Sequence, residues 1–213
     1  EEDRGVFDQC IDTIIRQVGD IGQMVDEFSS FARMRKPSKA DADIRNSVRE
    51  AAFMQTVGNP DIKITTDLPE DPVRATFDAR LIGQALTNVI KNAAEAIEGR
   101  TGDDLPEGRI LVKLEDAGEQ VVISVTDNGV GLPEENRQRL LEPYMTTREK
   151  GTGLGLAIVR KILEDHGGTI ELQDAPDTSL GETGTMVRLT LSKKAEDMID
   201  DNKNEQTDTT DGP

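Results

Sequence analysis

Two glycine-rich runs constrain what this chain can fold into more than any other feature of its sequence. Residues 127–131 read Asp-Asn-Gly-Val-Gly, and residues 151–156 read Gly-Thr-Gly-Leu-Gly-Leu. Glycine permits positive φ and has no Cβ, so a backbone rich in glycine can approach a ligand closely. Apolar residues follow the second run, which predicts that its amides open a helix, where free N–H groups bind anions. The pattern therefore predicts a loop that holds an anionic ligand.

Length and charge limit the classes of protein that this chain can represent. Its 213 residues suit one ordinary domain plus an extra element, with a real hydrophobic core. A formal charge of −17 argues against a nucleic-acid partner, since a nucleic-acid groove needs clustered Lys and Arg. Cys10 is the single cysteine, which excludes an internal disulfide and fits a reducing compartment. No apolar run approaches the roughly 18 residues of a membrane span, and no signal peptide is visible.

The two ends of the sequence differ from its middle. The chain begins at Glu1 rather than at methionine, which suggests a piece of a longer protein. Residues 196–211 hold seven acidic residues against one lysine, with Asn, Thr and Gln between them. Such a segment is too polar to build a core, so we expect residues 195–213 to form an acidic, disordered tail.

An apolar heptad pattern marks the N-terminal segment, residues 1–37, as a separate unit. Apolar residues recur at alternating spacings of four and three over residues 6–35, which predicts one long helix with a seam for a partner: Phe7, Ile11, Ile14, Val18, Ile21, Val25 and Phe28. Pro37 ends it, because the residue before proline is biased away from helix. One helix cannot bury this stripe alone. The partner is either the rest of the chain or, as we favour, another molecule.

From residue 38 to 194 the pattern mixes helices and strands. Asp78 is a good N-cap for a helix that Gly99 stops, and a turn near residues 117–118 joins two alternating strands as a hairpin. The order predicts an α+β fold: a two-layer α/β sandwich in which helices cover one face of a mixed, largely antiparallel sheet. The expected helices cover residues 44–57, 78–98 and 154–166, and the expected strands residues 62–66, 110–114, 121–125, 169–172 and 185–191.

Two asparagines on the expected helix 78–98 are candidate ligands for a cation. Asn88 and Asn92 are four residues apart, so they lie on one face, at the margin of the apolar stripe. An amide oxygen there could reach Mg²⁺, which prefers oxygen ligands and usually keeps waters and substrate phosphates. The competing interpretation is a pair of ordinary surface asparagines.

Asp127 ends an expected strand, where a carboxylate can accept a hydrogen bond from the exocyclic amine of adenine. Such a partner discriminates adenine from guanine, whose carbonyl would face the carboxylate unpaired. The alternative is a turn aspartate before Asn-Gly, a common turn pair. The segment 132–150 between the two glycine runs reads as a mobile lid, in which Arg148 and Lys150 either bind phosphates or are simply solvated.

Five motifs resemble, in order, those of one family. Residues 88–92, 127–131, 143–144, 151–155 and 184–185 resemble the N, G1, F, G2 and G3 boxes of the ATP-binding domain of sensor histidine kinases. That domain shares its fold with gyrase, Hsp90 and the mismatch-repair ATPases. The resemblance covers residues 40–192, and residues 146–155 and 164–168 look like the nitrogen-regulation (Ntr) sensor kinases.

The resemblance implies roles for matching positions. Asn92 resembles the magnesium ligand and Asn88 its companion near the phosphates. Asp127 resembles the adenine-binding carboxylate, and Thr185 resembles a threonine that supports adenine through water. The implied ATP-binding set is Asn88, Asn92, Asp127, Gly129, Gly131, Tyr144, Thr146, Thr147, Arg148, Lys150, Gly151, Thr152, Gly153, Leu154, Gly155, Leu156 and Thr185.

Two departures from the family pattern matter. Many members carry a basic residue three positions after the second asparagine, where this chain has Glu95, so Lys91 or Arg148 is expected to compensate. Residues 6–35 look like the second helix of the dimerisation and phosphoacceptor hairpin, whose first helix, with the acceptor histidine, is missing. His166 is the single histidine, and its place at a helix end favours a capping role over phosphate acceptance.

Three functions compete at this point. A histidine kinase would transfer the γ-phosphate of Mg-ATP to a histidine on a partner segment, for relay to a response-regulator aspartate. A clamp ATPase of the same fold needs a base at the position of Asn88, and an amide cannot take that proton. A non-catalytic dimerisation module with a relic pocket is the third, although the intact glycine runs argue against it. The first implies ATP, Mg²⁺, a homodimer, a response regulator and a membrane anchor through missing upstream segments.

Overall fold

The architecture was obtained from a computed structural model of the chain. It describes residues 36–102, 104–145, 152–176 and 183–194, together with part of the segment 11–29. The elements are β1 (Ala40–Asp43), α2 (Ile44–Gly58), β2 (Ile62–Asp67), β3 (Arg74–Phe77), α3 (Ala79–Glu98), β4 (Gly108–Ala117), β5 (Gln120–Asp127), the 3₁₀ helix η1 (Arg137–Leu141), α4 (Gly155–Glu164), β6 (Thr169–Asp174) and β7 (Thr185–Ser192).

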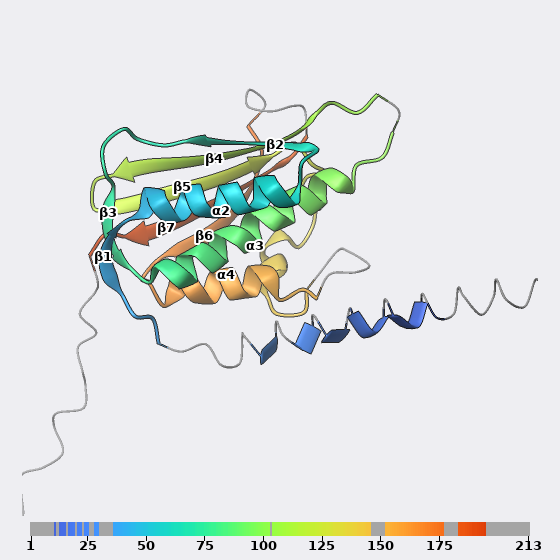
Figure 1. Ribbon diagram of the computed structural model, residues 1–213, viewed down its shortest axis with the longest axis horizontal. Coiled ribbons are helices and arrows are strands. Elements are labelled where there is room, and N and C mark those ends of the chain that lie inside the picture. Colours follow the sequence, from blue (N-terminus) through green and yellow to red (C-terminus); the bar gives the residue numbers. More distant parts are fainter. Residues whose placement is uncertain are drawn as a thin grey trace, which may run out of the picture.

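Five strands form the main sheet in the order β2-β4-β5-β7-β6 (Figure 1). Strands β2 and β4 are parallel, and the other neighbours are antiparallel. The hairpin β4–β5 turns at Gly118, whose φ of 78° is a conformation that glycine adopts without strain. The predicted mixed, largely antiparallel sheet is confirmed.

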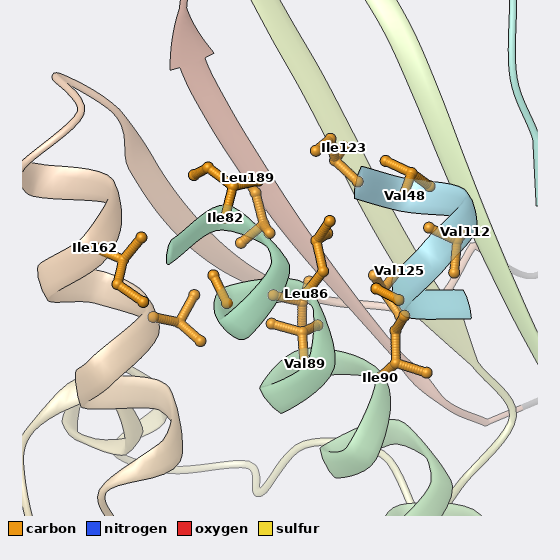
Figure 2. Packing of buried hydrophobic residues seen from close by; sticks show 14 of the residues in the cluster. Val48, Ile82, Leu86, Val89, Ile90, Val112, Ile123, Val125, Ile162 and Leu189 are labelled. Atoms are coloured by element: carbon orange, nitrogen blue, oxygen red, sulfur yellow. The ribbon is translucent and has the colours of Figure 1, made fainter. Parts of the chain in front are cut away.

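The helices α2, α3 and α4 lie in one layer over one face of this sheet (Figure 1). Helix α2 packs on β2 and β4, α3 on β4 and β5, and α4 on β6 and β7. Each strand places alternate side chains toward the helices, so the helical stripes and the inward strand positions share one core. Figure 2 shows Leu86 and Ile90 of α3 facing Val112 and Val125 of the sheet, and all four are essentially buried.

Local signals explain why α3 begins and ends where it does. The side chain of Asp78 accepts hydrogen bonds from the amides of Arg80 and Leu81, which are donors without partners inside the helix. Gly99 follows Glu98, and its amide bonds back to the carbonyl of Glu95. The predicted cap and the predicted end of this helix are both confirmed. Because α3 carries Asn88 and Asn92, its boundaries fix the position of the candidate site.

Two predictions for secondary structure needed correction. The chain has a second, two-stranded sheet of β1 and β3, which the sequence analysis left without strands. Helix α4 runs from Gly155 to Glu164, two residues short of the predicted end, and His166 lies beyond it. The physical reason is the turn at residues 165–168, where the Gly168 amide bonds to the carbonyl of Leu163.

Two predicted segments lie wholly or mostly outside the described residues. The tail 195–213 is one, and the long N-terminal helix over residues 6–35 is the other. Those residues of segment 11–29 that the structure describes are helical, with exposed apolar side chains such as Ile14, Val18 and Val25. The full length of this helix stays a prediction. Among the described residues, no helix combines the length and the hydropathy that a membrane crossing requires.

Candidate functional site

A cavity of about 530 Å³ lies where α3, the turn after β5, the start of α4, the edge strand β6 and its neighbour β7 meet. This volume falls within the range of small-molecule and cofactor pockets. Nine of the predicted site residues line it: Asn88, Asn92, Asp127, Gly131, Thr152, Gly153, Gly155, Leu156 and Thr185. Residues that are far apart in the sequence therefore converge on one space.

Asp127 is the buried carboxylate of this cavity and the last residue of β5. Its Oδ1 accepts a hydrogen bond from the Gly129 amide at 2.8 Å and another from the Thr185 amide at 3.2 Å. Two backbone donors, one from the turn after β5 and one from the start of β7, therefore fix the orientation of the carboxylate. A buried carboxylate in a fixed orientation can accept a hydrogen bond from an amine donor of a ligand, and a ligand carbonyl in the same place would be rejected.

Close backbone packing around Asp127 explains the glycines of the first run and of the 184–185 motif. A Cβ on Gly129 would lie 2.7 Å from atoms of Ala96 in α3. A Cβ on Gly184 would lie 1.9 Å from the carbonyl oxygen of Asp127, and Gly184 has a φ of 152°. Gly129 thus lets the turn after β5 pack closely against α3. It does not line the cavity itself.

Asn128 is a residue that the sequence analysis missed. Its side chain is buried, accepts a hydrogen bond from the Arg109 amide at 2.8 Å and donates one to the Glu107 carbonyl at 2.9 Å. Both partners precede or begin β4, so Asn128 fastens the turn of the cavity to the neighbouring strand. Its place in an Asp-Asn-Gly turn was the available signal, but that signal does not reveal a partner near residue 108.

The two asparagines of α3 face the start of α4. Asn88 Nδ2 donates to the carbonyl of Gly155 at 3.4 Å, and a Cβ on Gly155 would lie 3.8 Å from Asn92 Nδ2. The backbone N–H groups at the start of α4 therefore lie beside the side-chain amides of Asn88 and Asn92. This end of the cavity combines oxygen ligands with helix N–H donors, which suits a phosphate chain carrying a hard cation.

The loop before α4 is closed at its base by one backbone contact. The Tyr144 amide donates to the Gly153 carbonyl at 3.0 Å, and a Cβ on Gly153 would lie 2.6 Å from the Tyr144 carbonyl carbon. Gly153 has a φ of 68°, and Tyr144 has a φ of 64°, which is uncommon for a residue other than glycine. This contact joins Tyr144, within the predicted lid 132–150, to the second glycine run. The predicted site residues Thr146, Thr147, Arg148, Lys150 and Gly151 lie outside the described residues.

Two other predicted site residues do not line the cavity. The Leu154 side chain is fully buried in the hydrophobic core, where it anchors the first turn of α4. The Tyr144 side chain is 59% exposed, and the neighbouring Met145 lines the cavity instead. Apolar positions that the sequence analysis did not single out complete the lining, among them Leu132, Leu172 and Val187. They give the cavity apolar walls, as is usual for pockets that bind small molecules and cofactors.

His166 lies away from the cavity, at the other end of α4, and it is a capping group as predicted. Its Nδ1 donates to the Ile162 carbonyl at 2.6 Å, and its Nε2 accepts from the Asp78 amide at 3.0 Å. Burial lowers the pKa of His166, and the charge of Lys39 lowers it further, against the opposing effects of the Ile162 carbonyl, Asp78 and Asp165. The ring therefore caps as a neutral group, since Nε2 accepts a hydrogen bond while Nδ1 donates one.

Comparisons with known proteins agree with this geometry. Residues 77–195 match the family described as histidine kinase-, DNA gyrase B-, and HSP90-like ATPase. The match covers more than half of the chain, and the chain therefore belongs to this family of ATP-binding domains. It is 57% identical over 190 residues to the nitrogen regulation protein NtrY of Azorhizobium caulinodans, which covers 89% of this chain and 24% of NtrY. The predicted Ntr-type resemblance is thus confirmed.

Solved histidine kinases show the same fold. The full-length ShkA structure in complex with AMPPNP aligns with a TM-score of 0.68 and 26% identity, over 86% of this chain and 39% of ShkA. The histidine kinase ThkA in complex with the response regulator TrrA aligns with a TM-score of 0.68 and 25% identity, over 86% of this chain and 50% of ThkA. The chain spans about a quarter of the length of the first curated relatives that it matches.

Proposed function

We propose that this chain is the ATP-binding catalytic part of a two-component sensor histidine kinase of the Ntr type. It would transfer the γ-phosphate of ATP to a histidine on a dimerisation segment outside this sequence, for relay to an aspartate of a response regulator. The observation that carries the proposal is the convergence of Asp127, the Asn88–Asn92 pair and the start of α4 on one cavity. A purine at one end and a phosphate chain at the other fit this arrangement.

The described residues offer each part of the nucleotide a suitable partner. Asp127, oriented by two amides, would accept from the exocyclic amine of adenine, while the apolar lining would cover its faces. The amide oxygens of Asn92 and Asn88 would face the phosphates together with the α4 amides. Mg²⁺, when bound, would neutralise phosphate charge and hold the phosphate chain in place. No cluster of three or more His, Cys, Asp or Glu that could cage a metal is found within the described ranges, so the cation would arrive with the nucleotide.

Transfer to a protein histidine fits this site better than hydrolysis by a clamp ATPase. Hydrolysis needs a base beside the attacking water, and the amide of Asn88 cannot accept that proton. The other acidic side chain of the described lining apart from Asp127 is Glu95, about 10 Å along the helix from Asn88 at 1.5 Å per residue. An imidazole acceptor brings its own nucleophilic nitrogen, so positioning and charge neutralisation suffice.

The partners and placement of the whole protein follow as further parts of this proposal. Residues 1–37 would contribute the second helix of a dimerisation hairpin, residues 38–194 the catalytic domain and residues 195–213 an acidic tail. The full-length protein would be a homodimer through the N-terminal helix, anchored in the membrane by upstream segments, with this part in the cytoplasm.

The test is a phosphorylation assay in two parts. Labelled ATP and Mg²⁺ are added to this chain alone, and to this chain mixed with the acceptor-bearing dimerisation segment of the same protein. We expect acid-labile label on a histidine of the added segment and none on the chain alone. Asn92→Ala is expected to abolish the transfer, whereas Asn46→Ala, an exposed asparagine of α2, should retain it. Stable acid-labile label on His166, or no transfer despite bound ATP, would contradict the proposal.

A further inference from the structure

A polar stripe on α3 extends the site beyond the two asparagines. Asn88, Lys91, Asn92 and Glu95 occupy positions i, i+3, i+4 and i+7 of this helix, and all four line the cavity. Such spacing places side chains on one helical face, one turn after another. The cavity is therefore bordered along α3 by an amide, a cation, a second amide and an anion.

The described lining of the cavity carries more negative than positive side chains, which disfavours an anionic ligand. Among the described residues that line the cavity, Lys91 is the single cation, while Asp127 and Glu95 are acidic. A nucleotide triphosphate adds several negative charges to the same space. In a partly enclosed site, like charges a few ångströms apart repel strongly, so a cation close to the phosphates matters more here than on open surface.

The geometry of Lys91 leaves it able to move. Its Nζ lies 3.8 Å from Glu95 Oε1, which exceeds hydrogen-bonding distance, and the two side chains are 48% and 37% exposed. An exposed i,i+4 ion pair of this kind contributes little stability, because water screens both charges. A charge-assisted hydrogen bond to phosphate is stronger. Lys91 would therefore leave Glu95 when a phosphate offers a better partner.

The direction of that movement leads to the phosphate end of the cavity. Glu95 lies one turn toward the Asp127 turn, where Ala96 contacts Gly129. Asn88 lies one turn the other way, where its side chain meets Gly155 at the start of α4. Lys91 lies between them. Swinging from Glu95 toward Asn88 carries its ammonium from the carboxylate to the place where the α4 amides open.

We infer that Lys91 is a phosphate-binding residue of this site, which Glu95 holds beside the cavity until the triphosphate of ATP displaces it. The inference rests on the proposed function, because it names the part of the same ligand that Lys91 contacts. Glu95 then has a defined effect: it competes with the phosphates for Lys91 and repels them. Removing its charge should strengthen ATP binding, and removing the charge of Lys91 should weaken it.

Calorimetric titration with ATP, ADP and AMP tests this inference. We expect Lys91→Met to weaken ATP binding about tenfold, to weaken ADP binding less and to leave AMP binding unchanged. Glu95→Gln should tighten ATP binding a few-fold, and the double variant should lie between the two single variants. Lys161→Met is the matched control, since Lys161 forms an i,i+4 pair with Asp165 on α4 and does not line the cavity.

The outcomes separate the two proposals. If the unmodified chain binds no ATP, the proposed function fails. If it binds ATP and Lys91→Met binds ATP equally well, only the inference fails. Equal weakening for ATP and AMP would show that Lys91 supports the fold of the pocket, and an equal effect of Lys161→Met would show a general charge effect; either result overturns the inference. Thermal melting of each variant confirms that it is folded.

Discussion

At the scale of single residues, Asp127 depends on one local contact and on one that no local sequence pattern contains. Its Oδ1 is held by the amides of Gly129 and Thr185, and Thr185 lies 58 residues further along the chain. The position of Asp127 at the end of a strand was predictable from alternation followed by Asn-Gly. Its second donor was not, because that contact arises from the pairing of β5 with β7.

Asp127→Asn is expected to abolish measurable nucleotide binding. An amide offers one oxygen and one NH₂ group, so it cannot accept from both backbone amides and from an adenine amine without leaving a buried donor unpaired. The loss should exceed about a hundredfold in affinity, measured by calorimetry with ATP. Asp174→Asn changes an exposed carboxylate that pairs with Arg137, and it should bind ATP normally. Unchanged affinity of the Asp127 variant would place adenine elsewhere.

Gly184→Ala is expected to destabilise the domain strongly. The new Cβ would lie 1.9 Å from the Asp127 carbonyl oxygen at a φ of 152°, so the backbone of β5 or of β7 must move. We expect a loss of about 2–4 kcal/mol in the free energy of unfolding, measured by denaturant titration. Gly83→Ala is the matched control. Its Cβ meets nothing within 4 Å on α3, and alanine should stabilise the helix by up to about 1 kcal/mol.

At the scale of elements, α3 and α4 form a pair that is tied at one end and opens on the cavity at the other. At the tied end, the Asp78 amide donates to His166, while the Asp78 side chain also accepts from the Ser38 amide at 2.9 Å. Burial alone would raise the pKa of Asp78, but hydrogen bonds from the Ser38, Leu81 and Arg80 amides, with the charge of Arg80, bring it below its ordinary value. One buried carboxylate thus joins the segment after Pro37 to α3, and His166 joins α3 to α4.

The free energy of unfolding of the domain is expected to fall as the pH drops through the range in which His166 titrates in the unfolded chain. Because the pKa of His166 is lowered in the folded state, the unfolded chain binds the proton more readily once the pH falls below about 6.5. The stability that neutral His166 provides is therefore complete above this pH and is lost below it, by at most about 1.4 kcal/mol per pH unit. Asp78 acts in a different range, since its lowered pKa matters only near pH 4 and below.

Thermal melting between pH 8 and pH 5 measures this effect. The unmodified chain should lose more melting temperature over this range than His166→Gln, which is less stable at pH 8 but carries no titrating ring. Parallel melting curves for the two proteins would show that His166 does not govern the pH dependence.

The ends of a helix or strand could be predicted where capping residues and apolar periodicity agree. They could not be predicted where pairing between distant strands sets the ends. Helix α3 was predictable because Asp78, a continuous apolar stripe and Gly99 all point to the same ends. Strands β1 and β3 are four residues each, too short for alternation to stand out, and they pair across 30 residues and more. The parallel pairing of β2 with β4 depends on the path that the chain takes between these two strands. The spacing of apolar residues within each strand does not reveal that path.

At the scale of the whole molecule, the residues that line the candidate nucleotide cavity lie outside the N-terminal segment. All described residues that line the cavity lie between Asn88 and Val187. The apolar side chains described in segment 11–29 are exposed, with Ile15 at 65%, so no described part of the chain buries them. Binding of nucleotide should therefore not need the N-terminal segment, whereas association of two copies should.

Truncation to residues 38–194 is expected to separate these two properties. The shortened chain should keep its ATP affinity within about twofold and sediment as a monomer. The 213-residue chain should associate more strongly with rising concentration, because its heptad seam is free to pair. Sedimentation velocity and calorimetry on both chains measure the difference. A truncated chain that folds but binds no ATP would show that the two parts form one functional unit.

One cavity is expected to recognise adenine through Asp127 and a phosphate chain through α3 and the start of α4. Calorimetric titration of the 213-residue chain with Mg-ATP, repeated with Mg-GTP, tests it most directly. We expect saturable binding of one ATP per chain and at least about tenfold weaker binding of GTP, because the guanine carbonyl would face the Asp127 carboxylate. Absence of saturable heat with ATP, or equal affinity for both nucleotides, would contradict it.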